Sequence, residues 1–129
     1  MTADWVSRAE ASLALAKVVA KGVVIEDLCY QAQQAAEKAL KAVYISRQAP
    51  FVYIHNIDTL LLGLEAIGFE IPESVDAAGE LTRYAVETRY PGGFEPLTPE
   101  DLARAIGLAE SVLVWARTQV GMPDSGRPA

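Results

Sequence analysis

The stretch from Ile25 to Arg47 constrains the fold of this chain more than any other segment. Its small and apolar residues recur at steps of three and four, which places them on one stripe of an α-helix. That stripe comprises Ile25, Leu28, Cys29, Ala32, Ala36, Ala39, Leu40 and Val43. The polar residues fall mostly on the other side and comprise Gln31, Gln34, Glu37, Lys38 and Lys41. We therefore interpret the stretch as the central helix of a small bundle, with alanines that let neighbouring helices approach closely and with an open polar face.

Two further helices flank this stretch in the sequence. The first is predicted over about residues 3–21, with Thr2 as its cap and Gly22 at its end. Because only a few residues then precede the central helix, the two helices should form an antiparallel hairpin. After the central helix, a leucine-rich helix is predicted over about residues 57–67, and Asn56 is its expected N-cap.

The remaining part of the chain predicts two more helices. One runs from about residue 75 to residue 88 or 89, with Ser74 as its cap. The other begins at Thr98, where a proline and two acids follow the capping hydroxyl. The expected fold is all-α: an up-and-down helical bundle of about five helices built on a long antiparallel helical hairpin. One domain is expected over residues 1–120, with a flexible tail over residues 121–129.

Composition and charge exclude several classes of protein. A chain of 129 residues with 51% hydrophobic and 22% charged residues suits a single globular domain. Its formal net charge of −6 argues against general electrostatic binding to a nucleic-acid backbone. No signal peptide is visible, and no segment reaches the roughly 20 apolar residues of a membrane span. The protein is therefore expected to be cytoplasmic.

Motifs for metals, cofactors and reactive thiols are missing from the sequence. There is no GxxxxGK[ST] loop, no GxGxxG after a strand, no HExxH and no pair of histidines. The single cysteine, Cys29, cannot form an internal disulfide, and its place on the apolar stripe indicates a core residue rather than a nucleophile. No metal and no cofactor are expected.

His55 is the only histidine, and it precedes the expected start of the third helix. An imidazole in a loop can transfer a proton near neutral pH or hydrogen-bond a phosphate or a base. The alternative is structural, because His55 can also order the start of the helix together with Asn56 and Asp58.

A second group of candidate residues, Tyr84, Arg89 and Tyr90, lies near the end of the fourth helix. The arginine fork suits a phosphate, and a tyrosine ring offers a face on which a base can stack. Alternatively, Arg89 satisfies the carbonyl groups at that helix end.

Lys38 and Lys41 lie three residues apart on the central helix, and Arg47 follows its end. These cations are candidates for a small phosphate-binding surface. The alternative is a solvated face in which the lysines are mixed with Glu37, as is common on helix surfaces.

Three segments together carry a family resemblance. They are AQQAAEKALKA at Ala32–Ala42, IHNIDTLL at Ile54–Leu61 and LTRYAVETRYPGG at Leu81–Gly93. In this order, and over about residues 3–120, the chain resembles the HEPN domain, named for nucleotide binding in higher eukaryotes and prokaryotes.

The resemblance implies a compact helical bundle, commonly a homodimer, in small proteins often encoded beside a minimal nucleotidyltransferase. Many such pairs look like toxin–antitoxin systems. Some HEPN proteins are metal-independent ribonucleases that use an Arg-x(4–6)-His motif from each subunit. No arginine of this chain has a histidine at that spacing, since seven residues separate Arg47 from His55. What carries over is a groove for a nucleotide or a partner, with His55, Tyr84, Arg89 and Tyr90 as its expected residues.

Three functions follow as hypotheses. The first is a nucleotide-binding or regulatory partner of a minimal nucleotidyltransferase, most simply as a homodimer. The second is a metal-independent ribonuclease toxin, with His55 as general acid or base and Arg47 or Arg89 stabilising charge on the phosphate. The third is a purely structural interaction bundle that assembles through its alanine-rich helix faces.

Overall fold

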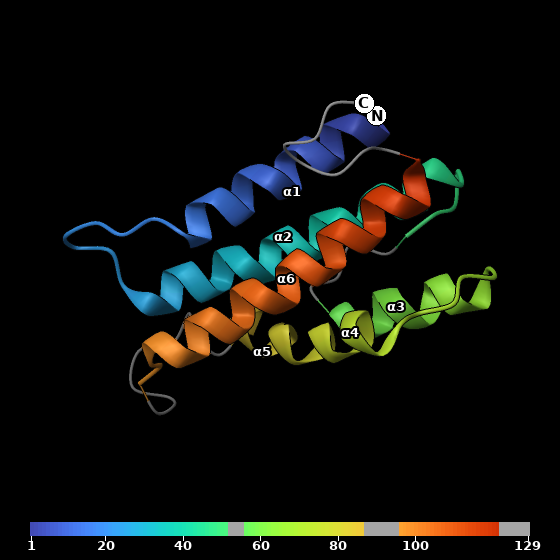
Figure 1. The fold of residues 1–129 in the computed structure, drawn as a ribbon. Helices are drawn as coiled ribbons and strands as arrows, with labels where there is room; N and C mark the ends of the chain where they lie inside the picture. The colour runs from blue at the N-terminus through green and yellow to red at the C-terminus, as the bar shows by residue number, and fades with distance from the viewer. Residues whose placement is uncertain (52–55, 87–95, 122–129) are drawn as a thin grey trace.

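Helices make up all of the regular structure in the computed structural model, which describes residues 1–51, 56–86 and 96–121. The elements are α1 (Thr2–Ala16), α2 (Ile25–Ser46), α3 (Ile57–Ala66), α4 (Glu73–Asp76), the 3₁₀-helix η1 (Ala77–Thr82), α5 (Arg83–Val86) and α6 (Pro99–Val120) (Figure 1). Since α4, η1 and α5 follow one another without a break, the described chain forms five helical segments. The predicted all-α bundle is therefore confirmed. None of the described helices is long and apolar enough to span a membrane.

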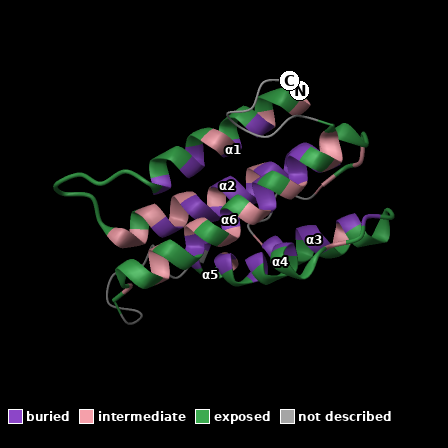
Figure 2. Ribbon diagram, viewed as in Figure 1, coloured by how far each residue is buried: buried purple, intermediate pink, exposed green. Residues whose placement is uncertain are grey.

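Helix α2 occupies the centre of the bundle, as its sequence predicts. It contacts α1, α3, η1, α5 and α6. Figure 1 shows that α2 runs back along α1 to form an antiparallel hairpin, with α6 beside both. In Figure 2 the buried positions of α2 extend along much of its length, in contrast to the mostly exposed outer side of α1.

Small side chains allow the close packing around α2. The buried alanines of this helix have no exposed surface and comprise Ala32, Ala35, Ala36, Ala39 and Ala42. Because a methyl group is the only bulk at these positions, the backbones of α1 and α6 approach α2 closely. Larger apolar side chains come from α3, where Leu60, Leu61 and Leu64 are at most 1% exposed. Burial of each such leucine contributes roughly 1.5–3 kcal/mol, which holds a helix too short to be stable alone.

Two helix starts follow the predicted capping chemistry. The side-chain oxygen of Asn56 accepts a hydrogen bond from the backbone N–H of Thr59 at 3.0 Å. At the start of α6, Thr98 and Asp101 form a reciprocal capping box, and Pro99 occupies the first helical position. Each cap satisfies backbone N–H groups that have no partner within the helix.

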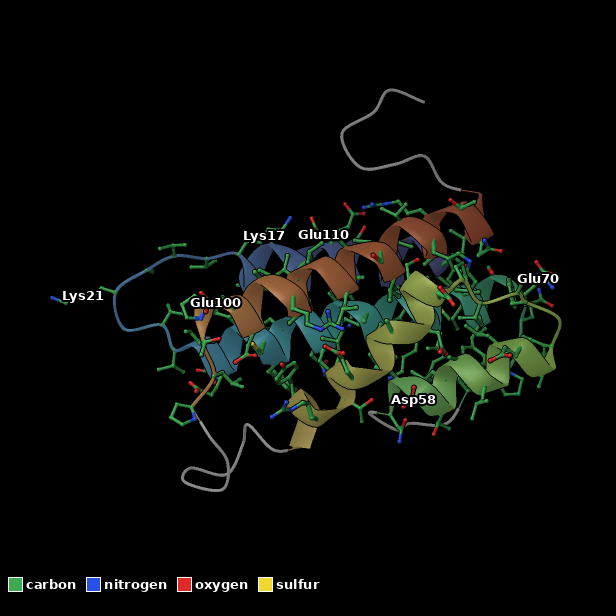
Figure 3. The ribbon with its side chains drawn as sticks, turned by 60° about the horizontal axis from the view of Figure 1, so that its bottom comes forward. Lys17, Lys21, Asp58, Glu70, Glu100 and Glu110 are labelled. Carbon is green, nitrogen blue, oxygen red and sulfur yellow. The ribbon has the colours of Figure 1, made fainter. Side chains whose placement is uncertain are left out.

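Helix α1 is shorter than predicted, and both of its predicted end signals are wrong. It begins at Thr2 with Met1 as the N-cap residue, and it ends at Ala16 instead of near residue 21. Lys17 forms an ion pair with Glu110 at 3.0 Å, and beyond it the chain leaves the bundle (Figure 3). None of the described elements covers the valine at position 19, which is fully exposed. A helix gains most of its stability from packing an apolar face, so the apolar pattern of residues 17–21 does not extend it.

The fourth predicted helix also differs from the expectation. Pro72, and not Ser74, is the N-cap residue, and the middle of the segment is the tighter helix η1. Gly79 lies in η1 directly against Asp58 of α3, where an added Cβ atom would clash with the carboxyl group. The close approach of α3 and the weak α-helix propensity of glycine together account for the 3₁₀ geometry. The predicted end at residue 88 or 89 lies outside the described residues.

Candidate functional site

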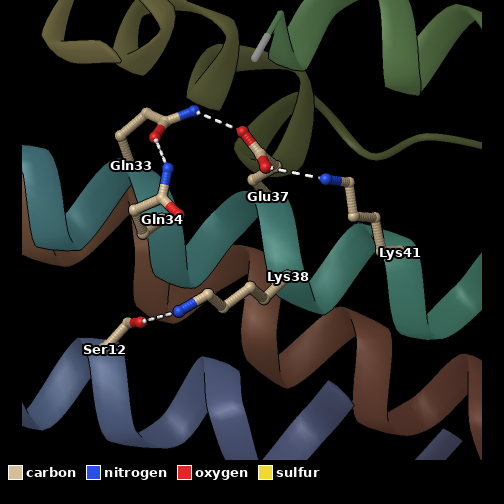
Figure 4. Close-up of polar contacts among 6 residues, drawn as sticks. All are labelled: Ser12, Gln33, Gln34, Glu37, Lys38 and Lys41. Atoms are coloured by element: carbon tan, nitrogen blue, oxygen red, sulfur yellow. Dashed lines mark hydrogen bonds and ion pairs between the residues drawn. The ribbon is translucent and has the colours of Figure 1, made fainter. Parts of the chain in front are cut away.

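Three polar side chains of α2 lie inside the protein, and we call Gln33, Glu37 and Lys41 the α2 polar row. Their exposed fractions are 0%, 3% and 6%. The Gln33 amide donates to Glu37 Oε1 at 3.0 Å, and Lys41 Nζ donates to Glu37 Oε2 at 2.8 Å (Figure 4). The i, i+4 spacing stacks the three side chains along one face of the helix.

The row corrects the expectation that Glu37 and Lys41 lie on an open polar face. Figure 4 shows the row on the side of α2 that faces α3 and the η1–α5 segment. Both of these elements contact α2. The central helix is therefore covered on its polar side as well as on its apolar side, and the glutamate and the lysine are taken out of water as an ion pair.

Aromatic rings surround the lysine end of the row. Lys41 Nζ lies 5.5 Å from the ring centroid of Phe51 and 5.8 Å from that of Trp5. The two rings meet edge to face, with centroids 6.1 Å apart. Cations are attracted to ring faces at such distances, and the attraction grows when water is excluded. Phe51 directly precedes the segment that contains His55, so the row ends beside the start of that segment.

Lys38 and Lys41 do not form a common exposed surface. Lys38 points toward α1, where its Nζ donates to Ser12 Oγ at 2.8 Å (Figure 4). Partial burial lowers the pKa of the Lys38 ammonium, and the Arg8 guanidinium lowers it further. Lys41 instead pairs with Glu37 and lies near the rings of Trp5 and Phe51, so the two cations have different environments.

Arg47 and Tyr84 have well-defined places. Arg47 is the C-cap residue of α2, and its guanidinium carbon lies 4.3 Å from the ring centroid of Phe69. Tyr84 is only 5% exposed, and the guanidinium carbon of Arg83 lies 5.4 Å from its ring centroid. Burial raises the pKa of the Tyr84 phenol above its usual range, so the hydroxyl stays protonated at neutral pH.

His55, Arg89 and Tyr90 lie outside the described residues. Asn56, which follows the first of these segments, caps α3, and Val86, which precedes the second, ends α5. The backbone N–H of Ile57 donates to Thr82 Oγ1 at 2.9 Å, and this bond joins the start of α3 to the end of η1. Helix α3, which follows the first segment, therefore adjoins the η1–α5 segment, which precedes the second.

Sequence reasoning did not find the burial of Gln33 or the contact between Glu80 and Arg104. Arg104 Nη2 donates to Glu80 Oε2 at 2.8 Å, one of two hydrogen bonds that link η1 to α6. These bonds hold the pKa of the Glu80 carboxyl below its usual range. The i, i+4 spacing of Gln33, Glu37 and Lys41 is a signal for mutual contact, but it does not distinguish an exposed row from a buried one.

Cys29 is a core residue with no exposed surface, as predicted. Burial raises the pKa of its thiol to about 11, and the carboxylates of Asp101 and Glu26 act in the same direction. Because the thiolate is the reactive form, we expect the native protein to react negligibly with dithiodipyridine at neutral pH. After unfolding in urea, the single thiol should release one equivalent of pyridinethione. Rapid reaction of the native protein would contradict this placement of the thiol.

No group of three or more potential metal ligands occurs within residues 1–51, 56–86 and 96–121. The described site is instead defined by a buried ion pair, amides and aromatic rings. It belongs to a small helical bundle with a charged interior on its central helix.

The sequence matches the family model of the HEPN domain over residues 2–119, and the chain belongs to the HEPN family. The structure is similar to the crystal structure of TT1696 from Thermus thermophilus, with 29% identity and a TM-score of 0.81. It is also similar to the structure of ST0689, an archaeal HEPN homologue, with 25% identity and a TM-score of 0.72. Each comparison covers 92% of this chain and 97% of the other. Among curated proteins, none matches the chain.

Proposed function

We propose that this HEPN protein binds a nucleotide and acts, as a homodimer, as the regulatory partner of a minimal nucleotidyltransferase in a pair of toxin–antitoxin type. The observation that carries the proposal is the α2 polar row, whose Lys41 lies beside the ring of Phe51. The nucleotide site would combine this region with His55, Tyr84, Arg89 and Tyr90.

The energetic cost of burying the ion pair of the α2 polar row supports a role of the row in function. Removing a carboxylate and an ammonium from water costs several kcal/mol for each ion, and their attraction offsets this only with good geometry. Helix α2 packs its other faces with alanine and leucine, so a purely structural role does not require charges here. In this proposal, the ion pair is retained because it positions other polar groups.

The proposed ligand-binding residues follow described residues closely in the sequence. His55 is four positions after Phe51, and Arg89 is three positions after Val86. In this proposal Arg89 binds phosphate through its planar fork, and Tyr90 stacks on the base.

The absence of an Arg-x(4–6)-His motif supports a binding protein over a ribonuclease. Arg47, the candidate nearest to His55 in the sequence, is placed against Phe69. We therefore expect no RNA cleavage in the presence of a chelator. Cleavage that is lost in His55→Ala would favour the ribonuclease instead.

We expect calorimetric titration with ATP and GTP to show saturable binding of at least one nucleotide. Arg89→Ala should weaken that binding at least about tenfold, because a charge-assisted hydrogen bond contributes about 1.5–3 kcal/mol. Lys17→Ala is the matched control, since it removes an exposed cation that pairs with Glu110. The control should bind as the wild type does.

If neither ATP nor GTP gives a heat of binding, the nucleotide part of the proposal is wrong. The partner part is tested separately by asking whether any nucleotidyltransferase encoded beside the gene co-purifies with the protein. If no such protein co-purifies and no nucleotide binds, the structural interaction bundle becomes the better description.

A further inference from the structure

The connection between α1 and α2 carries an unusual amount of exposed apolar surface. Residues 17–24 project from the end of the bundle (Figure 1). Five of the nine large apolar side chains exposed in the described chain lie in this connection or just before it, namely Leu15, Val18, Val19, Val23 and Val24. Contiguous apolar surface of this kind marks an interaction site more often than an isolated exposed leucine does.

A hollow of about 390 Å³ adjoins these valines. The connection lines one part of the hollow, and the N-terminal turns of α2 and α6 line another. The apolar residues that these turns contribute comprise Ile25, Leu28, Pro99, Leu102 and Ile106. The hollow is large enough to receive an isopropyl side chain.

Charges around the apolar surface are segregated. Between Glu10 and Glu26 the only charged residues are Lys17 and Lys21. Lys17 is paired with Glu110, whereas Lys21 extends outward from the tip of the connection (Figure 3). The neighbouring first turns of α2 and α6 are acidic, with Glu26 and Asp27 on one and Glu100 on the other.

We propose that this surface, which we call the hairpin tip, joins two copies of the chain about a two-fold axis. Val19 of each copy enters the hollow of the other, and Lys21 lies against the acidic turns of the other copy. An isologous contact requires a surface that is complementary to itself, and an apolar centre between a cation and carboxylates satisfies this. An anionic membrane surface suits the hairpin tip less well, because the carboxylates would be repelled.

The overall charge opposes association, because two chains of net charge −6 repel each other. A stable contact between two copies therefore needs local attraction where they meet. Lys21 is the cation at the tip that provides it. This assignment rests on the homodimer proposed above but not on nucleotide binding.

The test is sedimentation equilibrium at micromolar concentration. The wild type should be a dimer, and Val19→Asp should weaken association at least about a hundredfold, because each dimer loses two buried valines and gains two buried charges. Val19 is fully exposed in the single chain, so the variant should keep the helical circular dichroism of the wild type as a folded monomer. Leu62→Asp is the matched control, since Leu62 is 65% exposed on α3 and should leave the dimer intact.

A second pair of variants tests the contact between Lys21 and the acidic turns of the other copy. Lys21→Glu should weaken the dimer, and combining it with Glu100→Lys should restore much of the association. A dimer that tolerates both Val19→Asp and Lys21→Glu would overturn the hairpin tip while leaving the homodimer in place. A monomeric wild type would overturn both, whereas the nucleotide titration is independent of either result.

Discussion

Lys41→Met is expected to lower the free energy of unfolding by about 3 kcal/mol, because it leaves the buried Glu37 carboxylate without the Lys41 cation. Glu37 is 3% exposed, and Lys41 Nζ lies 2.8 Å from its Oε2 atom. Methionine fills a similar volume, so lost packing contributes little to the effect. Urea unfolding followed by circular dichroism measures the change.

Two variants isolate the electrostatic cause. Lys38→Met removes the neighbouring lysine, which is only partly buried and donates to Ser12, and it should cost about 1 kcal/mol or less. Glu37→Gln combined with Lys41→Met removes both charges and should recover most of the stability lost in Lys41→Met. If Lys41→Met lowers the free energy of unfolding no more than Lys38→Met does, the ion pair does not stabilise the protein as described.

The second large effect is expected from Gly63→Ala in α3. An added Cβ atom at Gly63 would collide with the hydroxyl of Tyr44, which is 5% exposed and donates to the carbonyl of Leu60 at 2.6 Å. The ring is buried and its hydroxyl is hydrogen-bonded, so the collision displaces α3 or breaks the hydrogen bond. Either outcome should lower the free energy of unfolding by about 2–4 kcal/mol, despite the better helix propensity of alanine.

Gly107→Ala provides the matched comparison. Gly107 lies in α6, and an added Cβ atom there meets nothing within 4 Å. The same substitution should therefore raise the free energy of unfolding by about 0.5–1 kcal/mol. Thermal unfolding of the two variants side by side measures the difference. Equal effects would show that the collision with Tyr44 does not destabilise the Gly63→Ala variant.

Much of the fold was predictable because its signals are local. The apolar stripe from Ile25 to Val43 marks the central helix, whose observed start at Ile25 agrees with the prediction. The caps at Asn56 and Thr98 were also predicted, since each uses residues three positions apart in the sequence. The hairpin was also predicted, although its connection over residues 17–24 is longer than expected. These features depend on neighbours in the chain, which a sequence displays directly.

The errors fall where distant elements decide the structure. Apolar residues near Val19 suggested more helix, but no described element covers that valine, and α1 ends at Ala16. The segment around Gly79 was predicted as α-helix, whereas its contact with Asp58 of α3 accompanies a 3₁₀ turn. In both cases the structure depends on whether an element far away in the sequence packs against the segment.

The sequence by itself determined the helical class, the central helix and the family, because periodicity, caps and motif order are written along the chain. Only the tertiary structure decided that Glu37 and Lys41 are a buried ion pair and not a solvated one. The i, i+4 spacing is the same in both cases. What differs is whether α3 and the η1–α5 segment cover that face of α2, and burial depends on this covering and not on the spacing.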